Sequence, residues 1–165
     1  AFICVGGELA ALSEEVLYQL LDIMPVARLG LLDGVGLPEA MPIVFARVSD
    51  SLFSPIDGKP KSSAKLARIK LIENQPKGTL LLDHYNDNWE QLWWVKMDIE
   101  ATVISMEHNL WDQAVSGLRA KYPQYHSVSL FKDNPTMIGV RWTRVRWWAS
   151  NELKGIKRWI ETRVV

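Results

Sequence analysis

The clearest element of this sequence is a long strand near its middle, marked by alternating apolar and polar residues. In the segment 95–103 every second residue is apolar, and the residues between them are polar or charged. A period of two is typical of a β-strand with one buried and one solvated face. Shorter β-rich runs between turn sequences predict further strands over 26–32, 41–48, 51–56 and 78–83. Because these runs follow one another directly, we expect an antiparallel sheet.

The last predicted strand contains a break in this alternation. Val140 and Trp142 belong to one apolar set, but Val145 and Trp147 belong to the opposite phase. One extra residue in a strand produces such a flip. The pattern therefore predicts a β-bulge near Thr143.

Helical spacing replaces alternation in three other segments. Ser13, followed by two glutamates, predicts the N-cap of a helix that Pro25 ends. A second helix is expected over 59–74, with Ser62 or Ser63 as its cap, and a third between Ser105 and Pro123. Six strands with three helices suggest a small barrel of the α+β, mainly β, class. We expect one domain over 1–165, with a helical lead-in over 1–24 and a C-terminal helix or arm over 151–165.

Composition narrows the classes of partner and location. The chain has 165 residues, 19 basic against 19 acidic side chains, and one cysteine, Cys4. Balanced charge gives no reason to expect nucleic acid or an anionic membrane as a partner. We expect a cytoplasmic protein for three reasons: it has one cysteine, its opening residues lack a signal-peptide pattern, and it has no long apolar run.

Few residue patterns point to chemistry by themselves. Nucleophile-elbow, Walker and Rossmann motifs are absent from the sequence, and its three histidines lack metal-ligand spacing. We therefore expect no metal site and name no catalytic residue. Basic and hydroxyl residues do gather at one predicted strand-to-helix junction, where they could hold a phosphate: Lys59, Lys61, Ser62, Ser63, Lys65 and Arg68. The same stripe also suits a solvated helix face.

Several strings of the sequence resemble the flavin-binding split barrels related to pyridoxamine 5′-phosphate oxidase. The most specific strings are Asp57-Gly58-Lys59-Pro60-Lys61, Asp83-His84-Tyr85 and Lys121-Tyr122-Pro123, and the likeness runs from about Pro25 to Ser150. It is most similar to the branch associated with the deazaflavin F420. The resemblance implies a six-stranded antiparallel split β-barrel with flanking helices that works as a homodimer.

The resemblance also implies a cofactor site between two subunits. Met41, Pro42, Ile43 and Val44 would contact the flavin ring through their backbone, with Ser54, Pro55 and Ile56 beside it. Lys59, Lys61, Ser62 and Arg68 would hold the phosphate, and Lys65 adds to the basic stripe. Arg68 stands where the family usually has a lysine, a change that keeps the charge.

Tryptophans are expected near the ring of the cofactor. Trp94 falls where the oxidases carry a ring-contacting glutamine, which argues against vitamin B6 phosphates as substrates. Trp147 and Trp148 could reach across the dimer interface, although core packing is the commoner role of tryptophan. His84 and Tyr85 are polar candidates for which a surface-loop role is favoured.

Together these features predict an oxidoreductase that uses FMN or F420. It would transfer a hydride to or from a small unsaturated or aromatic substrate, and the redox chemistry would belong to the cofactor. A non-catalytic protein that binds flavin or haem on the same barrel is the alternative, and a purely structural dimer is a further one. The basic residues leave FMN and F420 unresolved.

Overall fold

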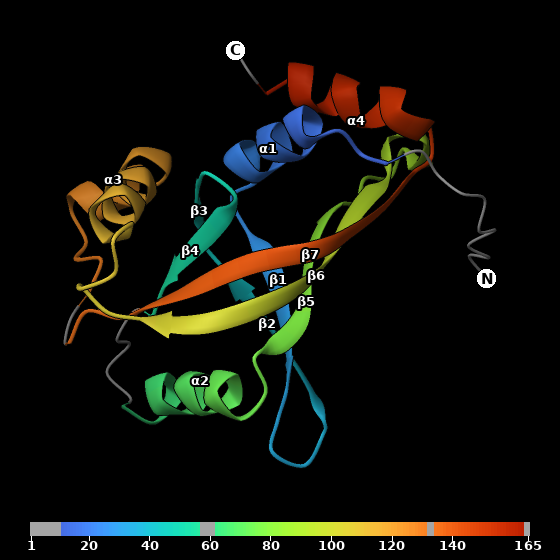
Figure 1. Cartoon of the computed structure of the whole chain (residues 1–165). Coiled ribbons are helices and arrows are strands. Elements are labelled where there is room, and N and C mark those ends of the chain that lie inside the picture. The colour runs from blue at the N-terminus through green and yellow to red at the C-terminus, as the bar shows by residue number, and fades with distance from the viewer. Residues whose placement is uncertain (1–10, 57–61, 132–133, 164–165) are drawn as a thin grey trace.

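The structure is a computed structural model that describes residues 11–56, 62–131 and 134–163, as four α-helices around one antiparallel sheet (Figure 1). In chain order the elements are α1 (Glu14–Ile23), β1 (Ala27–Leu32), β2 (Pro38–Ile43), β3 (Ala46–Val48), β4 (Ser51–Pro55), α2 (Ser62–Asn74), β5 (Lys77–His84), β6 (Trp93–Ile104), α3 (Trp111–Lys121), β7 (Met137–Ala149) and α4 (Glu152–Glu161). Two short 3₁₀ turns, η1 (Trp89–Gln91) and η2 (Pro123–His126), precede β6 and follow α3.

The two edges of the sheet are joined by only two residues. The strand order is β2-β1-β5-β6-β7-β4-β3, so β2 and β3 lie at opposite edges. Ile43 ends β2 and Ala46 begins β3, which leaves Val44 and Phe45 to connect the edges. A sheet whose edges are this close in sequence must curl on itself. The result is a half-barrel, and we call the Val44–Phe45 connection the seam.

The expected number of six strands was wrong, because the described residues form seven. The run over 41–48 forms β2 and β3 instead of one strand. At the break, the backbone N–H of Phe45 donates to the hydroxyl of Tyr122 over 3.0 Å. The Phe45 carbonyl lies 3.0 Å from the same hydroxyl. A side chain from α3 thus replaces the neighbouring strand as the partner of this peptide.

The β-bulge predicted near Thr143 is confirmed. Asp98 of β6 pairs with Arg144 of β7, whereas Ile99 pairs with Trp142, so Thr143 is the extra residue. Its hydroxyl donates to the carbonyl of Asp98 over 3.3 Å. The bulge keeps apolar residues directed to the core on both sides of the break.

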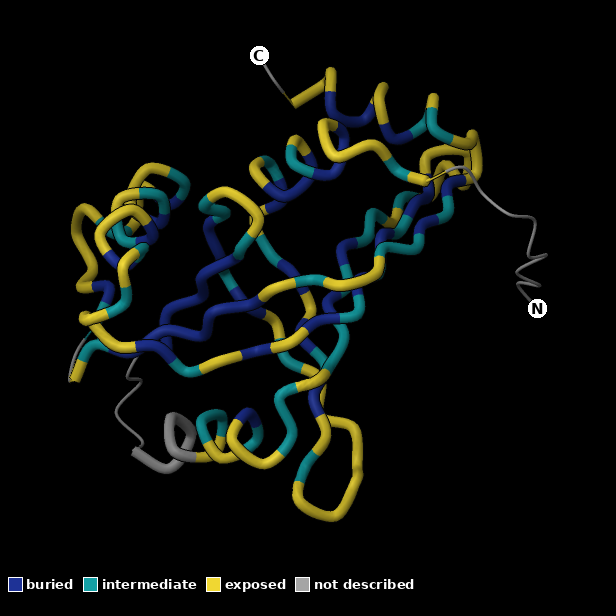
Figure 2. The backbone as a smooth tube through the Cα atoms, viewed as in Figure 1, coloured by how far each residue is buried: buried dark blue, intermediate teal, exposed yellow. Residues whose placement is uncertain are grey.

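The core consists of two apolar clusters. The larger one joins the inner face of the sheet to α1, α2 and α4, and the second packs α3 against β3, β4 and the start of β7. Figure 2 shows the buried residues along the sheet strands and the inward sides of the helices. The helices lie around the ends and sides of the sheet, and none crosses the middle of β6 and β7 in Figure 1.

The predicted helices are largely confirmed. Ser13 caps α1 by accepting from the N–H of Val16 over 3.4 Å. The segment after Ser150 forms α4, but α3 begins at Trp111, later than the cap expected at Ser105. Within the described ranges, no helix has the length and apolar character needed to cross a membrane. The same residues contain no group of three or more histidine, cysteine, aspartate or glutamate side chains suited to a metal ion.

Candidate functional site

The structure brings one group of predicted site residues together at the seam. Met41, Pro42 and Ile43 end β2, and Val44 follows in the seam. Strands β3 and β4 are antiparallel, and Ala46 at the start of β3 pairs with Phe53. Val44, which precedes Ala46, therefore lies toward the same end of the sheet as Ser54 and Pro55. Ser54 and Ile56 are 3% and 2% exposed. We therefore expect any contact that these two residues make with a ligand to be through their backbone.

The predicted phosphate residues follow directly on this group. Lys59 and Lys61 lie outside the described residues, and the side chains of Ser62 and Lys65 lie outside them as well. The backbone of Ser62 begins α2, six residues after Ile56, as the strand-to-helix prediction requires. Arg68 is half-buried on α2, and its side chain forms no ion pair with any described residue. We call the seam, the end of β4 and the start of α2 the seam group.

Trp94 and Trp148 lie far along the strands from Ser54. They form a cross-strand pair between β6 and β7. Ser54 of the seam group pairs with Ile138, which pairs with Val103, nine residues along β6 from Trp94. Nine strand residues span about 30 Å. Pro42 lies nearer to the tryptophans, because it pairs with Arg28, Arg28 pairs with Leu81, and Leu81 pairs with Lys96 of β6. One subunit therefore holds the β4 end of the predicted site far from Trp94 and Trp148, and its β2 residues level with Lys96.

Trp147 differs from Trp148 in the direction of its side chain. Trp147 pairs with Val95 and is 7% exposed in the larger core cluster. Trp148 is half-buried on the opposite face of the sheet. Trp147 therefore packs in the core of this subunit, whereas Trp148 faces outward.

The face that carries Trp94 and Trp148 is half-buried and charged. Residues that alternate with the core residues on β5, β6 and β7 form the outer face of the sheet, and we call the part of it around Trp94 and Trp148 the outer sheet face: Leu81, Asp83, Trp94, Lys96, Asp98, Arg146 and Trp148. All seven are of intermediate exposure in the single chain. Half-buried aromatic and charged residues with no covering element are typical of a surface that meets a partner or ligand.

Charges on this outer sheet face interact with one another and with an indole ring. Arg146 pairs with Asp98, while its Nε is buried without a hydrogen-bond partner among the residues described. The Lys96 ammonium lies 5.7 Å from the ring centre of Trp94. At the edge of the face, Arg28 pairs with Asp83 at 2.5 Å. An unsatisfied guanidinium N–H and an ammonium beside an indole offer donors to an electron-rich planar ligand.

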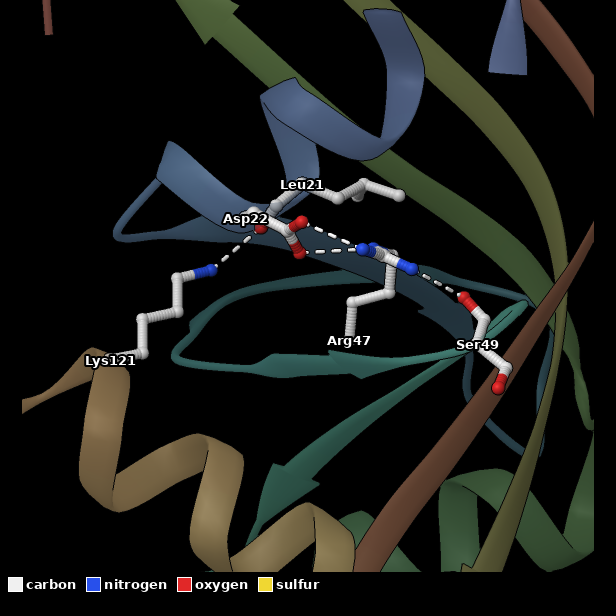
Figure 3. Close-up of polar contacts among 5 residues, drawn as sticks. All are labelled: Leu21, Asp22, Arg47, Ser49 and Lys121. Atoms are coloured by element: carbon white, nitrogen blue, oxygen red, sulfur yellow. Dashed lines mark hydrogen bonds and ion pairs between the residues drawn. The ribbon is translucent and has the colours of Figure 1, made fainter. Parts of the chain in front are cut away.

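A polar cluster behind the seam was not predicted. The Lys121 ammonium donates to the carbonyl of Leu21 over 2.7 Å and lies 3.8 Å from the ring centre of Phe45. Arg47 of β3 makes two bonds to the carboxylate of Asp22, at 2.9 and 2.7 Å (Figure 3). Three segments, the end of α1, β3 and the end of α3, are thereby fixed around the seam.

Burial alters the acidity of two groups in this region. It lowers the pKa of Lys121 to about 8, against which the carboxylate of Asp22 acts. It raises the pKa of the Tyr122 hydroxyl to about 12, so this hydroxyl stays protonated and can donate. The hydroxyl lies 2.9 Å from the Pro25 carbonyl and 3.0 Å from that of Phe45. The only sequence signal for this cluster is the string Lys121-Tyr122-Pro123. The resemblance includes this string but assigns no role to its residues.

Comparison by sequence finds no match to a family model and no match among curated proteins. Comparison by structure finds the fold in many solved proteins. HutZ, the heme storage protein from Vibrio cholerae, is 12% identical with a TM-score of 0.63, and the match covers 82% of this chain and 93% of the HutZ chain. An FAD-binding protein from Mesorhizobium loti is 13% identical with a TM-score of 0.62, covering 82% and 94%. A proposed pyridoxamine 5′-phosphate oxidase from Listeria innocua is 15% identical with a TM-score of 0.57, covering 81% and 96%.

These neighbours have split-barrel folds of the pyridoxamine-5′-phosphate-oxidase-like type. At such low identity the likeness defines the fold of this chain: an α+β, mainly β, half-barrel of the split-barrel kind. By their names, HutZ stores heme and the Mesorhizobium loti protein binds FAD.

Proposed function

We propose that this chain binds a flavin-type cofactor between the two subunits of a homodimer and acts as an oxidoreductase on a small-molecule substrate. The observation that carries the proposal is the fold, shared with a protein named for FAD binding and with one named as a pyridoxamine 5′-phosphate oxidase. The deazaflavin F420 is included, because the strings of the sequence resemble the branch associated with it.

The distance along the strands between two predicted site residues of one subunit supports a site built from two subunits. Trp94 and Ser54 lie about 30 Å apart along paired strands. This separation along the strands favours a ligand that contacts Ser54 in one copy and Trp94 in the other. A twofold axis that sets the outer sheet face of one copy against the seam group of the other would unite them, and twofold dimers are the commonest assembly.

The outer sheet face fits one side of a flavin ring. Trp94 and Trp148 offer broad aromatic surface, and interfaces are enriched in such residues. Lys96 and the unpartnered Nε of Arg146 supply positive charge beside them. Positive charge near the ring is one means by which a protein tunes a flavin.

Each part of the chain would then have a separate task. The seam presents backbone groups to the ring, and the start of α2, with Arg68, holds the phosphate by charge and helix-start N–H groups. The tryptophans of the partner exclude water from the ring. When bound, the cofactor supplies the hydride chemistry, so no acid or base from the chain is required.

A non-catalytic binding protein is the alternative, and it is favoured by neighbours such as HutZ, named for heme storage. Haem iron commonly takes a histidine ligand. The described histidines lie elsewhere than on the outer sheet face: His84 contacts Trp159, His108 contacts Phe53, and His126 is exposed in η2. This arrangement favours flavin over haem at that face.

Titration of the purified apoprotein with FMN, F420 and haem tests the proposal. We expect saturable binding of FMN or F420 and loss of that binding in K61A/R68A, whose secondary structure should be unchanged. Turnover of the bound cofactor by added reductant separates the enzyme from the carrier. A Soret band with haem and no affinity for either flavin would contradict the proposal.

A further inference from the structure

A pocket lies on the core side of the sheet, away from the outer sheet face. It has a volume of about 380 Å³ and lies between the end of β5, the turn η1 and the helix α4. His84, which pairs with the buried Trp93, forms part of its wall. Trp94 points to the opposite face of the sheet. The pocket is therefore separate from the proposed cofactor site.

Two arginines of α4 and the residues after it give this pocket its charge. Arg158 and Arg163 line it, and among the described residues of its lining only Glu90 is acidic. Within the described part of the chain, neither arginine is paired with a carboxylate. Arg163 stacks 4.0 Å over the ring of Trp159, which holds its guanidinium beside the pocket. An excess of fixed positive charge at a concave site favours anions.

Further donors lie in the same wall. The indole Nε1 of Trp159 is buried without a hydrogen-bond partner among the described residues, and Trp159 is only 8% exposed. His84 packs against this indole at 5.6 Å between ring centres. Burial, followed by the charge of Arg163, lowers the pKa of His84, while Asp83 acts against this shift. Buried donors without partners are uncommon in native proteins and call for an explanation.

We propose that this pocket binds the oxyanion group, a carboxylate or a phosphate, of a small molecule held by Arg158 and Arg163. Guanidinium groups match the planar oxygens of both anions and bind them through paired hydrogen bonds. A volume of about 380 Å³ suits a metabolite-sized molecule. The inference is independent of flavin binding, because it uses residues of the other sheet face.

Calorimetric titration of the full chain with inorganic phosphate and with citrate tests this site. We expect saturable binding of at least one probe at one site per chain, and the probe that binds identifies the oxyanion. R158Q should weaken the affinity about tenfold, since a charge-assisted hydrogen bond is lost. R158Q/R163Q should abolish binding while leaving FMN or F420 affinity unchanged and unfolding cooperative.

K154Q/K157Q is the matched control, because it removes two charges from exposed positions of the same helix that do not line this pocket. Its affinity should stay within about twofold of the unaltered protein. Absence of saturable binding for both probes would overturn the proposal. An equal loss of anion affinity in K154Q/K157Q would also overturn it. Loss of anion binding in K61A/R68A, with binding retained in R158Q/R163Q, would overturn it too, because the anion would then bind at α2.

Discussion

The hydroxyl of Tyr122 fixes the place where the sheet closes on itself. It accepts from the N–H of Phe45 and lies within hydrogen-bond distance of two carbonyls, those of Phe45 and Pro25. These contacts replace the strand pairing that Phe45 lacks. No periodicity in the sequence reveals such a role, because it depends on one side chain 77 residues away from its partner.

Removal of this hydroxyl should loosen the seam. In Y122F the N–H and carbonyl of Phe45 lose a buried partner, which costs about 1–3 kcal/mol in the free energy of unfolding. Urea denaturation measures this loss. Y85F is the control, since Tyr85 is 69% exposed and its substitution should change the unfolding free energy little. Equal stability of Y122F and the unaltered protein would contradict this role.

Lys121 should make stability depend on alkaline pH in a defined direction. Its pKa is about 8 in the folded protein, against an ordinary 10.5, so the folded state releases the proton first as pH rises. The unfolded state then binds more protons, and the unfolding free energy increases with pH across this window. The neutral amine can still donate to the Leu21 carbonyl. K121M removes the titrating group and should lose this gain.

The comparison of the two proteins isolates Lys121 from other titrating groups. Urea denaturation at several values between about pH 7 and pH 10 should show the unaltered protein gaining stability relative to K121M. Parallel curves for the two proteins would show that Lys121 has no shifted pKa in the fold.

Elements defined by local periodicity were predictable, and elements defined by distant contacts were not. The alternation over β6 and its phase flip in β7 located a long strand and the Thr143 bulge. The break between β2 and β3 depends on Tyr122, and the late start of α3 follows a turn in which His108 Nδ1 accepts from the N–H of Leu110. Neither contact leaves a periodic signal.

The bulge itself can be tested by deletion. Removal of Thr143 takes out the extra residue, so Trp142 and Arg144 become neighbours in regular alternation and Trp147 still faces the core. We expect the deletion variant to keep a cooperative unfolding transition, because no side chain changes face. T143A keeps the register and loses only an exposed hydrogen bond, so its stability should change by less than about 1 kcal/mol. A deletion variant without a cooperative transition would contradict the assignment of Thr143 as the extra residue of the bulge.

At the scale of the whole molecule, the sequence contained the site residues but not their distribution. The resemblance named the seam group and the tryptophans as one set. About 30 Å of paired strand separates Ser54 from Trp94, whereas only the strands β1 and β5 lie between Pro42 and Lys96. The alternation over 95–103 predicts a solvated face for Lys96 and Asp98, and Arg146 has no predicted role. Their proximity to Trp94 and Trp148 depends on the register of β6 and β7, which a single sequence does not define.

The shared site makes a prediction that no single-subunit site would share. K61A/R68A alters the phosphate end, and W94A/W148A alters the tryptophan end, so neither homodimer should bind FMN or F420. In a mixed dimer, one of the two sites combines the intact phosphate end of one copy with the intact tryptophans of the other. A refolded equal mixture, half of it mixed dimers, should recover about a quarter of the normal sites.

The most direct measurement is therefore the flavin-binding stoichiometry of this mixture, with native mass spectrometry to establish that mixed dimers form. Our account predicts that binding returns only after mixing, at the affinity of the unaltered protein. Mixed dimers that form but bind neither FMN nor F420, while the unaltered protein does, would contradict a cofactor site shared between subunits.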